Sequence, residues 1–158
     1  VRPGAGPICS VHELPEAVLD APSSPVEVLW MERVNPVFLS PGPDRWRKAL
    51  ERIPFIVSFS SFMDESSSLA DLVLPPHSCI EAWQYGFSAT LEGNGVVSFA
   101  PPVTAPFYDT GDHGDFILSL AQGLGGRIAS ALPWKTFLDS LEEAAGPAQA
   151  GEAGVPVP

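Results

Sequence analysis

A chain of 158 residues with 45% hydrophobic residues is long enough to bury a core in one domain, and this composition argues against disorder in the body of the chain. The net charge of −11, with only eight Lys and Arg residues, argues against binding to the phosphate backbone of nucleic acids. No apolar run reaches the roughly 18 residues that span a bilayer. The N-terminal residues lack both an initiator Met and the apolar segment of a signal peptide, so we expect a processed chain or a fragment.

The first half of the chain predicts alternating strands and helices. Apolar runs rich in β-branched and aromatic residues predict strands at residues 26–31, 55–59 and 71–75. A helix is predicted over residues 44–53, with Asp44 as N-cap and with Trp46 and Leu50 facing the core. Between the second and third strands one short helix fits, with Asp64 as its N-cap.

The second half is irregular until residue 112. The stretch EGNGVVSFA, residues 92–100, predicts a turn followed by a fourth, edge strand. A helix is predicted over residues 112–124, and its apolar stripe consists of Phe116, Ile117, Leu120 and Leu124. A last helix is predicted to begin at Pro133, and it should bury Trp134, Phe137, Leu138 and Leu141.

This order of elements predicts an α/β fold: a three-layer, Rossmann-like domain with a mainly parallel sheet flanked by helices. Right-handed crossovers place the carboxyl ends of the strands at one rim, where ligands bind in such sheets. We expect a Pro-rich lead-in arm over residues 1–25, the α/β domain over residues 26–145, and a disordered tail or linker over residues 146–158.

The rim after the second predicted strand carries the stretch SFSSFMDESSS, residues 58–68. Its hydroxyls suit a phosphate or ribose, and the carboxylates of Asp64 and Glu65 can accept hydrogen bonds from a sugar or from a guanine edge. The alternative is that Asp64 and residues 66–68 cap a short helix, and composition alone favours this alternative. The sequence contains neither GxGxxG nor GxxxxGK[ST], so an ordinary dinucleotide or P-loop site is unsupported.

Other candidate residues carry weaker signals. The three histidines (His12, His77 and His113) lack metal-ligand spacing, and we predict no metal site. Two cysteines, Cys9 and Cys79, are too few for a disulfide framework or a four-thiolate metal site. Glu81 follows the third strand and two prolines, so it is either a rim carboxylate or an ordinary surface glutamate.

Three stretches together resemble the molybdopterin oxidoreductases of the dimethyl sulfoxide reductase superfamily: NPVF after the first strand, PFIVSFSSFMDESSSLADLVLPPHSCIE, and PPVTAPFYDTGDHGDFILSLAQGLG. The usual family pattern is a strand with NP, a "tET..ADvVLP…E" block, and a Pro-containing segment before a helix. The form SFSSFMDES is most similar to the large subunits of polysulfide, thiosulfate and tetrathionate reductases and to the related subunit of alternative complex III. The resemblance covers roughly residues 14–142.

The resemblance implies an inner α/β domain that holds the guanosine end of a molybdopterin guanine dinucleotide in an enzyme of the anaerobic-respiration type. The cofactor-binding positions carried over from the family are Asn35, Pro36, Ser58, Ser60, Asp64, Glu65, Ser66 and Glu81. Many family members have Asp or Gln near the position of Ser60, and the glycine that usually follows the counterpart of Glu81 is displaced in AWQYGF.

The same resemblance shows which parts of such an enzyme this chain lacks. The family's iron–sulfur segment needs four cysteine-type ligands, and its metal pocket lies in another domain; we therefore expect no iron–sulfur cluster and no catalytic residue in this chain, and whether it is an enzyme stays open. The implied partners are the remaining domains, an iron–sulfur electron-transfer subunit and a membrane anchor subunit, with a periplasmic or membrane-associated location through those subunits. The alternative is a cofactor-free scaffold or interaction domain of a quinone-linked respiratory complex.

Overall fold

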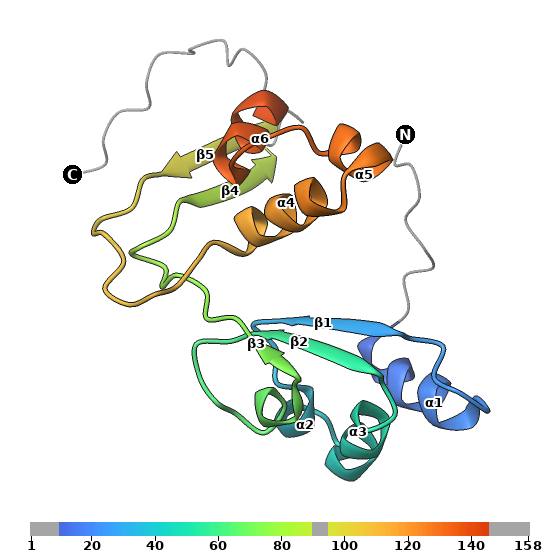
Figure 1. The fold of residues 1–158 in the computed structure, drawn as a ribbon. Helices are drawn as coiled ribbons and strands as arrows, with labels where there is room; N and C mark the ends of the chain where they lie inside the picture. The colour runs from blue at the N-terminus through green and yellow to red at the C-terminus, as the bar shows by residue number, and fades with distance from the viewer. Residues whose placement is uncertain (1–9, 90–94, 146–158) are drawn as a thin grey trace. The chain divides into compact units, whose positions relative to one another are not determined.

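The computed structural model describes residues 10–89 and 95–145. They divide into two compact units, the first ending at Pro76 and the second beginning at His77 (Figure 1). The predicted domain boundaries, with a single α/β domain over residues 26–145, stay predictions. The tail predicted over residues 146–158 lies outside the described residues.

The first unit is built on a three-stranded parallel sheet in the order β1-β2-β3. Its strands are β1 (Val28–Glu32), β2 (Phe55–Phe59) and β3 (Leu72–Val73). Val28 pairs with Phe55, and Val57 pairs with Leu72. The prediction of an α/β, Rossmann-like fold with a parallel sheet flanked by helices is confirmed. The first strand begins two residues later than predicted, and the third is shorter than predicted.

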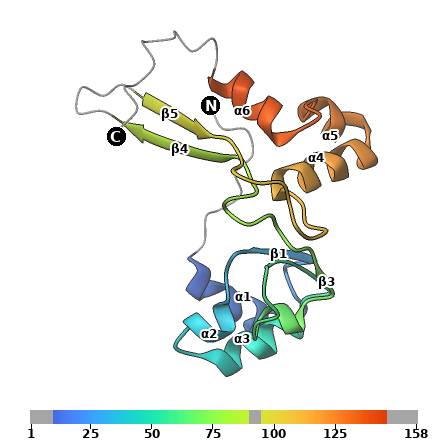
Figure 2. The ribbon, with the colours of Figure 1, turned by 90° about the vertical axis from the view of Figure 1, so that its left-hand side faces the viewer.

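The helices of the first unit lie on one side of this sheet (Figure 2). They are η1 (Val11–Glu13), α1 (Leu14–Asp20), α2 (Pro36–Leu39), α3 (Pro43–Leu50) and η2 (Ser67–Leu69). The helix predicted over residues 44–53 is α3, and Trp46 and Leu50 are buried as predicted. The short helix α2 was not predicted, because NPVFLSPGP has the composition of a long turn.

The core of the first unit forms where α1, α2 and α3 pack against the sheet. Its buried members are Val18, Met31, Val37, Trp46, Ala49, Leu50, Ile53 and Ile56. The guanidinium of Arg52 donates hydrogen bonds of 2.7 Å to the carbonyl oxygens of Leu19 and Ala21, so the end of α1 is tied to the segment after α3. Val18 contributes to this core from within the predicted lead-in arm, because the short helix α1 packs against α3.

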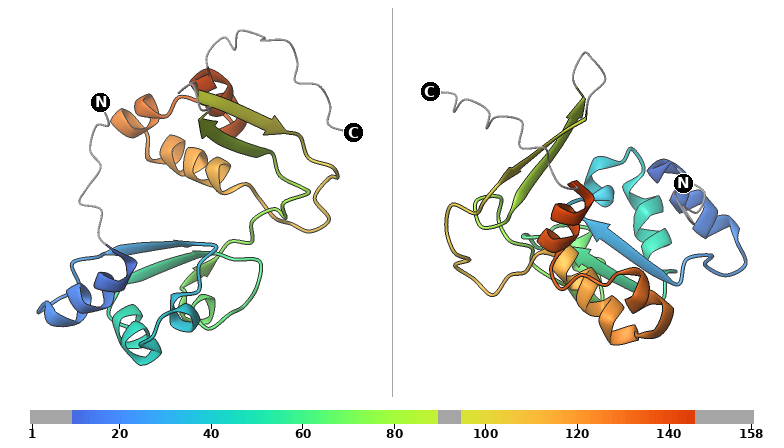
Figure 3. Two further views of the ribbon diagram at one scale, coloured as in Figure 1. Left: turned by 180° about the vertical axis from the view of Figure 1, so that it is seen from behind. Right: turned by 90° about the horizontal axis from the view of Figure 1, so that it is seen from above.

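The described residues of the second unit form an antiparallel strand pair and three helices, whose arrangement can be followed in Figure 3. The elements are β4 (Gln84–Ala89), β5 (Gly95–Ala100), α4 (His113–Leu124), α5 (Gly126–Ala131) and α6 (Phe137–Ala145). The predicted fourth strand is β5. The turn predicted before it lies mostly outside the described residues. The last helix begins at Phe137 rather than at Pro133.

The buried face of α4 differs from the predicted one. The buried residues are Gly114, Leu118 and Ala121, whereas Ile117 and Leu120 are 38% and 52% exposed. The physical reason is close approach: a Cβ added at Gly114 would overlap the ring of Phe137 on α6. The contact with α6 requires the small residue Gly114, and the predicted stripe is not the buried face of α4: Leu124 is also exposed, at 63%, and Phe116 is only half-buried.

Candidate rim site in the first unit

The carboxyl ends of β1 and β2 lie beside each other because the two strands are parallel neighbours. Beyond the last strand pair, the backbone N–H of Arg33 donates to the carbonyl oxygen of Phe59 over 3.1 Å. Arg33 has a φ of 48°, a left-handed conformation that residues other than glycine adopt rarely. This strained residue lies where the chain leaves β1. Strained backbone conformations cluster at functional sites.

Three hydrogen bonds join the loop after β1 to the loop after β2. The side-chain amide of Asn35 donates from Nδ2 to Glu65 Oε2 over 2.7 Å. Ser66 Oγ donates to Asn35 Oδ1 over 2.7 Å and accepts from the backbone N–H of Val37 over 3.0 Å. Asn35 is also the N-cap of α2, where its Oδ1 accepts from the backbone N–H of Phe38. Pro36 is buried as the first residue of that helix.

The remaining predicted rim residues form bonds within their own loop. Ser58 Oγ lies 3.0 Å from Ser67 Oγ, and both hydroxyls are buried. Ser60 Oγ donates to the carbonyl oxygen of Phe62 and accepts from its backbone N–H, which closes a local turn. Asp64 Oδ1 accepts from the backbone N–H groups of Ser66 and Ser67, but the N-cap residue of η2 is Ser66 rather than Asp64, because the helix begins at Ser67, later than predicted. Within the described part of the chain, no buried side-chain nitrogen or oxygen lacks a hydrogen-bond partner.

Glu65 is the predicted site residue of this loop whose charged carboxylate is exposed on the surface. The Asn35 amide lowers the pKa of the Glu65 carboxyl from its ordinary value of 4.5. The backbone N–H of Glu65 and the positive charge of Arg47 act in the same direction, while desolvation and the negative charge of Asp64 oppose them. Glu65 is therefore ionised near neutral pH, and a carboxylate accepts up to about four hydrogen bonds.

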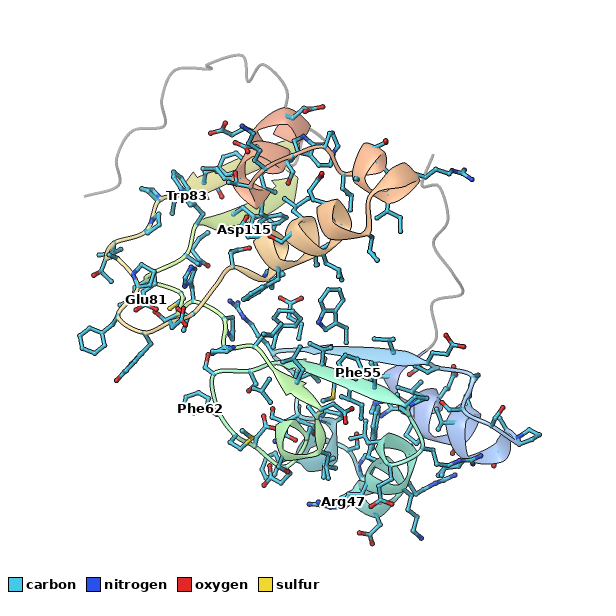
Figure 4. All side chains as sticks on the ribbon, in the orientation of Figure 1. Arg47, Phe55, Phe62, Glu81, Trp83 and Asp115 are labelled. Carbon is cyan, nitrogen blue, oxygen red and sulfur yellow. The ribbon has the colours of Figure 1, made fainter. Side chains whose placement is uncertain are left out.

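Glu81 belongs to the second unit. Its Oε1 accepts from the backbone N–H of Phe107 over 2.9 Å and its Oε2 from that of Ser78 over 3.0 Å. The Phe107 N–H and then the Ser78 bonds lower the pKa of the Glu81 carboxyl. A pocket of about 320 Å³ lies beside it, lined by His77, Glu81, Trp83, Asp112, Asp115 and Phe137, among others. Of these residues, Glu81, Trp83 and Asp115 can be followed in Figure 4.

The structure thus brings together Asn35, Pro36, Glu65 and Ser66, with Asp64 capping the same loop. Ser58 and Ser60 lie on the same segment but bond to neighbours of their own. The sequence did not indicate Arg33, which has a positive φ, or Arg47, whose charge on α3 acts on Glu65. Neither property produces a recognisable sequence motif. Among residues 10–89 and 95–145, no three His, Cys, Asp or Glu side chains are grouped to hold a metal ion.

Comparison with known proteins points to one class of protein. No family model matches this chain. It is 31% identical, over 126 residues and 80% of its length, to a menaquinone reductase, molybdopterin-binding-like subunit, of Nitratidesulfovibrio vulgaris. It is 29% identical, over 137 residues and 85% of its length, to the assimilatory nitrate reductase catalytic subunit of Bacillus subtilis. These two homologues point to the molybdopterin oxidoreductases.

This chain covers only a small part of both relatives, 18% of the length of each. The first relative is named as one subunit of a reductase, which implies a complex of several subunits. In the described part of this chain, no helix has both the length and the apolar composition that crossing a membrane requires.

Proposed function

We propose that this chain is part of a molybdopterin oxidoreductase and that the rim of its first unit binds the guanosine end of a molybdopterin guanine dinucleotide. The observation that carries the proposal is the bond between Asn35 and Glu65, which holds an ionised carboxylate where two parallel strands end. Ligands of open α/β sheets bind outside the carboxyl ends of the strands. The relatives support the class of enzyme.

The residues at the rim fit the base of such a nucleotide. The N1–H and the exocyclic amine of guanine are adjacent donors, and an exposed carboxylate is their natural acceptor. The hydroxyls of Ser58 and Ser66 are buried and already bonded, so they do not face a diphosphate. The cofactor supplies a redox-active metal at its pterin end when bound, and this chain is proposed to hold the nucleotide end only.

The proposal also includes the other domains and subunits with which this chain would assemble. The remaining domains of the oxidoreductase would enclose the rest of the cofactor, and an iron–sulfur subunit and a membrane anchor would carry electrons to or from it in an anaerobic respiratory chain. The menaquinone reductase relative supports a complex of several subunits.

NMR titration of the 158-residue chain with GDP tests the proposal. We expect saturable shifts at Asn35, Glu65 and Ser66, with a millimolar dissociation constant that corresponds to about −4 kcal/mol, because the rest of the site is missing. Glu65→Gln should weaken binding about tenfold. Glu51→Gln, which removes the same charge from the exposed end of α3, should leave binding unchanged. Shifts scattered over the surface, or equal in both variants, contradict the proposal.

A second candidate function is a scaffold domain that keeps the fold without the cofactor, within a quinone-linked respiratory complex. Two observations favour it: the first relative is named "molybdopterin-binding-like", and the serines of the rim are satisfied by neighbouring protein groups. Absence of saturable GDP binding, together with co-purification of the full-length protein with other subunits, would favour the scaffold.

A further inference from the structure

The orientation of the Asn35 side chain is determined by its partners. The oxygen and nitrogen of an amide group are usually hard to tell apart, and hydrogen bonds must decide between them. Here Oδ1 accepts from the Phe38 backbone N–H and from Ser66 Oγ. Both partners supply hydrogens, so this end must be the oxygen, and Nδ2 is directed to Glu65 Oε2 at 2.7 Å.

The role of the Ser66 hydroxyl follows from its other bond. The backbone N–H of Val37 donates to Ser66 Oγ over 3.0 Å, so the single hydroxyl hydrogen of Ser66 is available to Asn35. Ser66 is 0% exposed, so water does not replace this contact. A continuous chain of donors therefore runs from Val37 through Ser66 and Asn35 to the surface carboxylate of Glu65.

An exposed glutamate normally samples many rotamers and loses that freedom when it binds a ligand. The bond from Asn35 restrains the Glu65 carboxylate before any ligand arrives, and preorganised groups bind more tightly and more selectively than mobile ones. The Asn35 cap on α2 and the Asp64 cap on the following loop fix both ends of the connection.

We propose that Ser66 and Asn35 are positioning residues, which hold the Glu65 carboxylate as a fixed acceptor that selects a base with two adjacent N–H donors. This inference rests on the proposed function. It distinguishes guanine, which has the N1–H and the exocyclic amine, from hypoxanthine, which lacks the amine. The structural alternative is that the chain of bonds only joins two loops.

The first test follows the titration of Glu65 by NMR of its side-chain carboxyl carbon and needs no ligand. In Ser66→Ala the pKa of Glu65 should rise toward 4.5, although Ser66 does not contact that carboxylate, because the Asn35 amide then loses the shorter of the two bonds that orient its Oδ1 and keeps only the one from Phe38. Asp64 and Arg47, the charged neighbours that act on Glu65, are unchanged in this variant. Ser66→Thr, which keeps the hydroxyl, should restore the wild-type titration.

The matched control is Ser67→Ala. Ser67 is the adjacent serine, equally buried, and its hydroxyl bonds to Ser58 rather than to Asn35. A purely structural role for these serines predicts the same change in both alanine variants. A Glu65 titration that is unchanged in Ser66→Ala, or shifted equally in Ser67→Ala, overturns the proposal whether or not GDP binds.

The second test measures selectivity. Wild type should bind GDP about tenfold more tightly than IDP, the factor that corresponds to 1.4 kcal/mol. Asn35→Asp keeps an acceptor for the cap on α2 but removes the donor to Glu65, and it should reduce the GDP-to-IDP ratio to about one. Failure of wild type to bind GDP refutes the proposed function and the selectivity, while the titration still decides whether the positioning chain exists. An unchanged ratio in Asn35→Asp contradicts the positioning role directly.

Discussion

At the scale of single residues, the serine-rich loop after β2 separates buried hydroxyls from an exposed charge. Ser66 and Ser67 are buried with partners for their hydroxyls. A buried hydroxyl left without a partner costs roughly 1–3 kcal/mol, so these bonds stabilise the loop. Glu65 keeps its carboxylate at the surface, and this division of roles accounts for the many polar side chains between β2 and β3.

Glu81 should make the second unit sensitive to acid. The Phe107 and Ser78 N–H groups lower the folded-state pKa of Glu81 below 4.5, so its stabilising effect is present above pH 4.5 and is lost as the pH falls through the lowered value. The protection of the Phe107 amide against hydrogen exchange, relative to the intrinsic rate at each pH, should therefore decrease in wild type as the pH falls through the lowered pKa of Glu81. In Glu81→Gln the exchange should be faster at neutral pH and lose this pH dependence; a wild-type profile in that variant would refute the role of the carboxylate.

At the scale of elements, close approach decides how the second unit packs. The ring of Tyr85 on β4 lies 5.7 Å from that of Phe137 on α6 in an edge-to-face arrangement. Phe137 also lies against Gly114 of α4, and its backbone N–H donates to Asp115 Oδ1 over 2.7 Å. One aromatic side chain thus joins three elements, and it requires a residue without a Cβ at position 114.

Two glycines of α4 provide a matched pair for this interpretation. Gly114→Ala should destabilise the second unit by about 1–3 kcal/mol, because the new methyl group overlaps Phe137. Gly123→Ala should stabilise it by up to about 1 kcal/mol, because nothing lies within 4 Å of the new Cβ and alanine favours helices. Urea unfolding monitored by signals of the second unit measures both; equal effects would contradict the close packing of α4 and α6.

At the scale of the whole molecule, this chain corresponds to less than a fifth of each relative. Its two cysteines cannot provide the four cysteine-type ligands of the family's iron–sulfur segment. The 158-residue chain by itself should therefore not reduce polysulfide, thiosulfate or tetrathionate with a reduced viologen as donor. Spectrophotometric assay of viologen oxidation checks this expectation. Turnover that persists after treatment with a metal chelator and repurification would contradict it.

Part of this structure was predictable because it depends on local order in the sequence. Three features predict a parallel α/β sheet whatever the details of packing. They are the apolar runs at residues 55–59 and 71–75, the helix with Trp46 and Leu50, and the order of strands and helices. The rim position of Asn35 and Glu65 follows from the same order, since loops that leave neighbouring parallel strands meet.

The tertiary structure decided what depends on contacts between distant segments. Strand β4 was not predicted. Its alternating aromatic residues form a strand by pairing with β5, and the sequence of this part of the chain has no regular pattern that indicates the pairing. The close approach of Gly114 on α4 to Phe137 follows from the pairing of α4 with α6, which the apolar pattern of α4 alone does not encode. The partners of Ser58 and Ser66 follow from the approach of other segments, which composition does not encode. The α/β class could be predicted because the pattern of each apolar run is a local property of the sequence. Which polar groups near the strand ends are already bonded to neighbouring protein groups depends on tertiary packing.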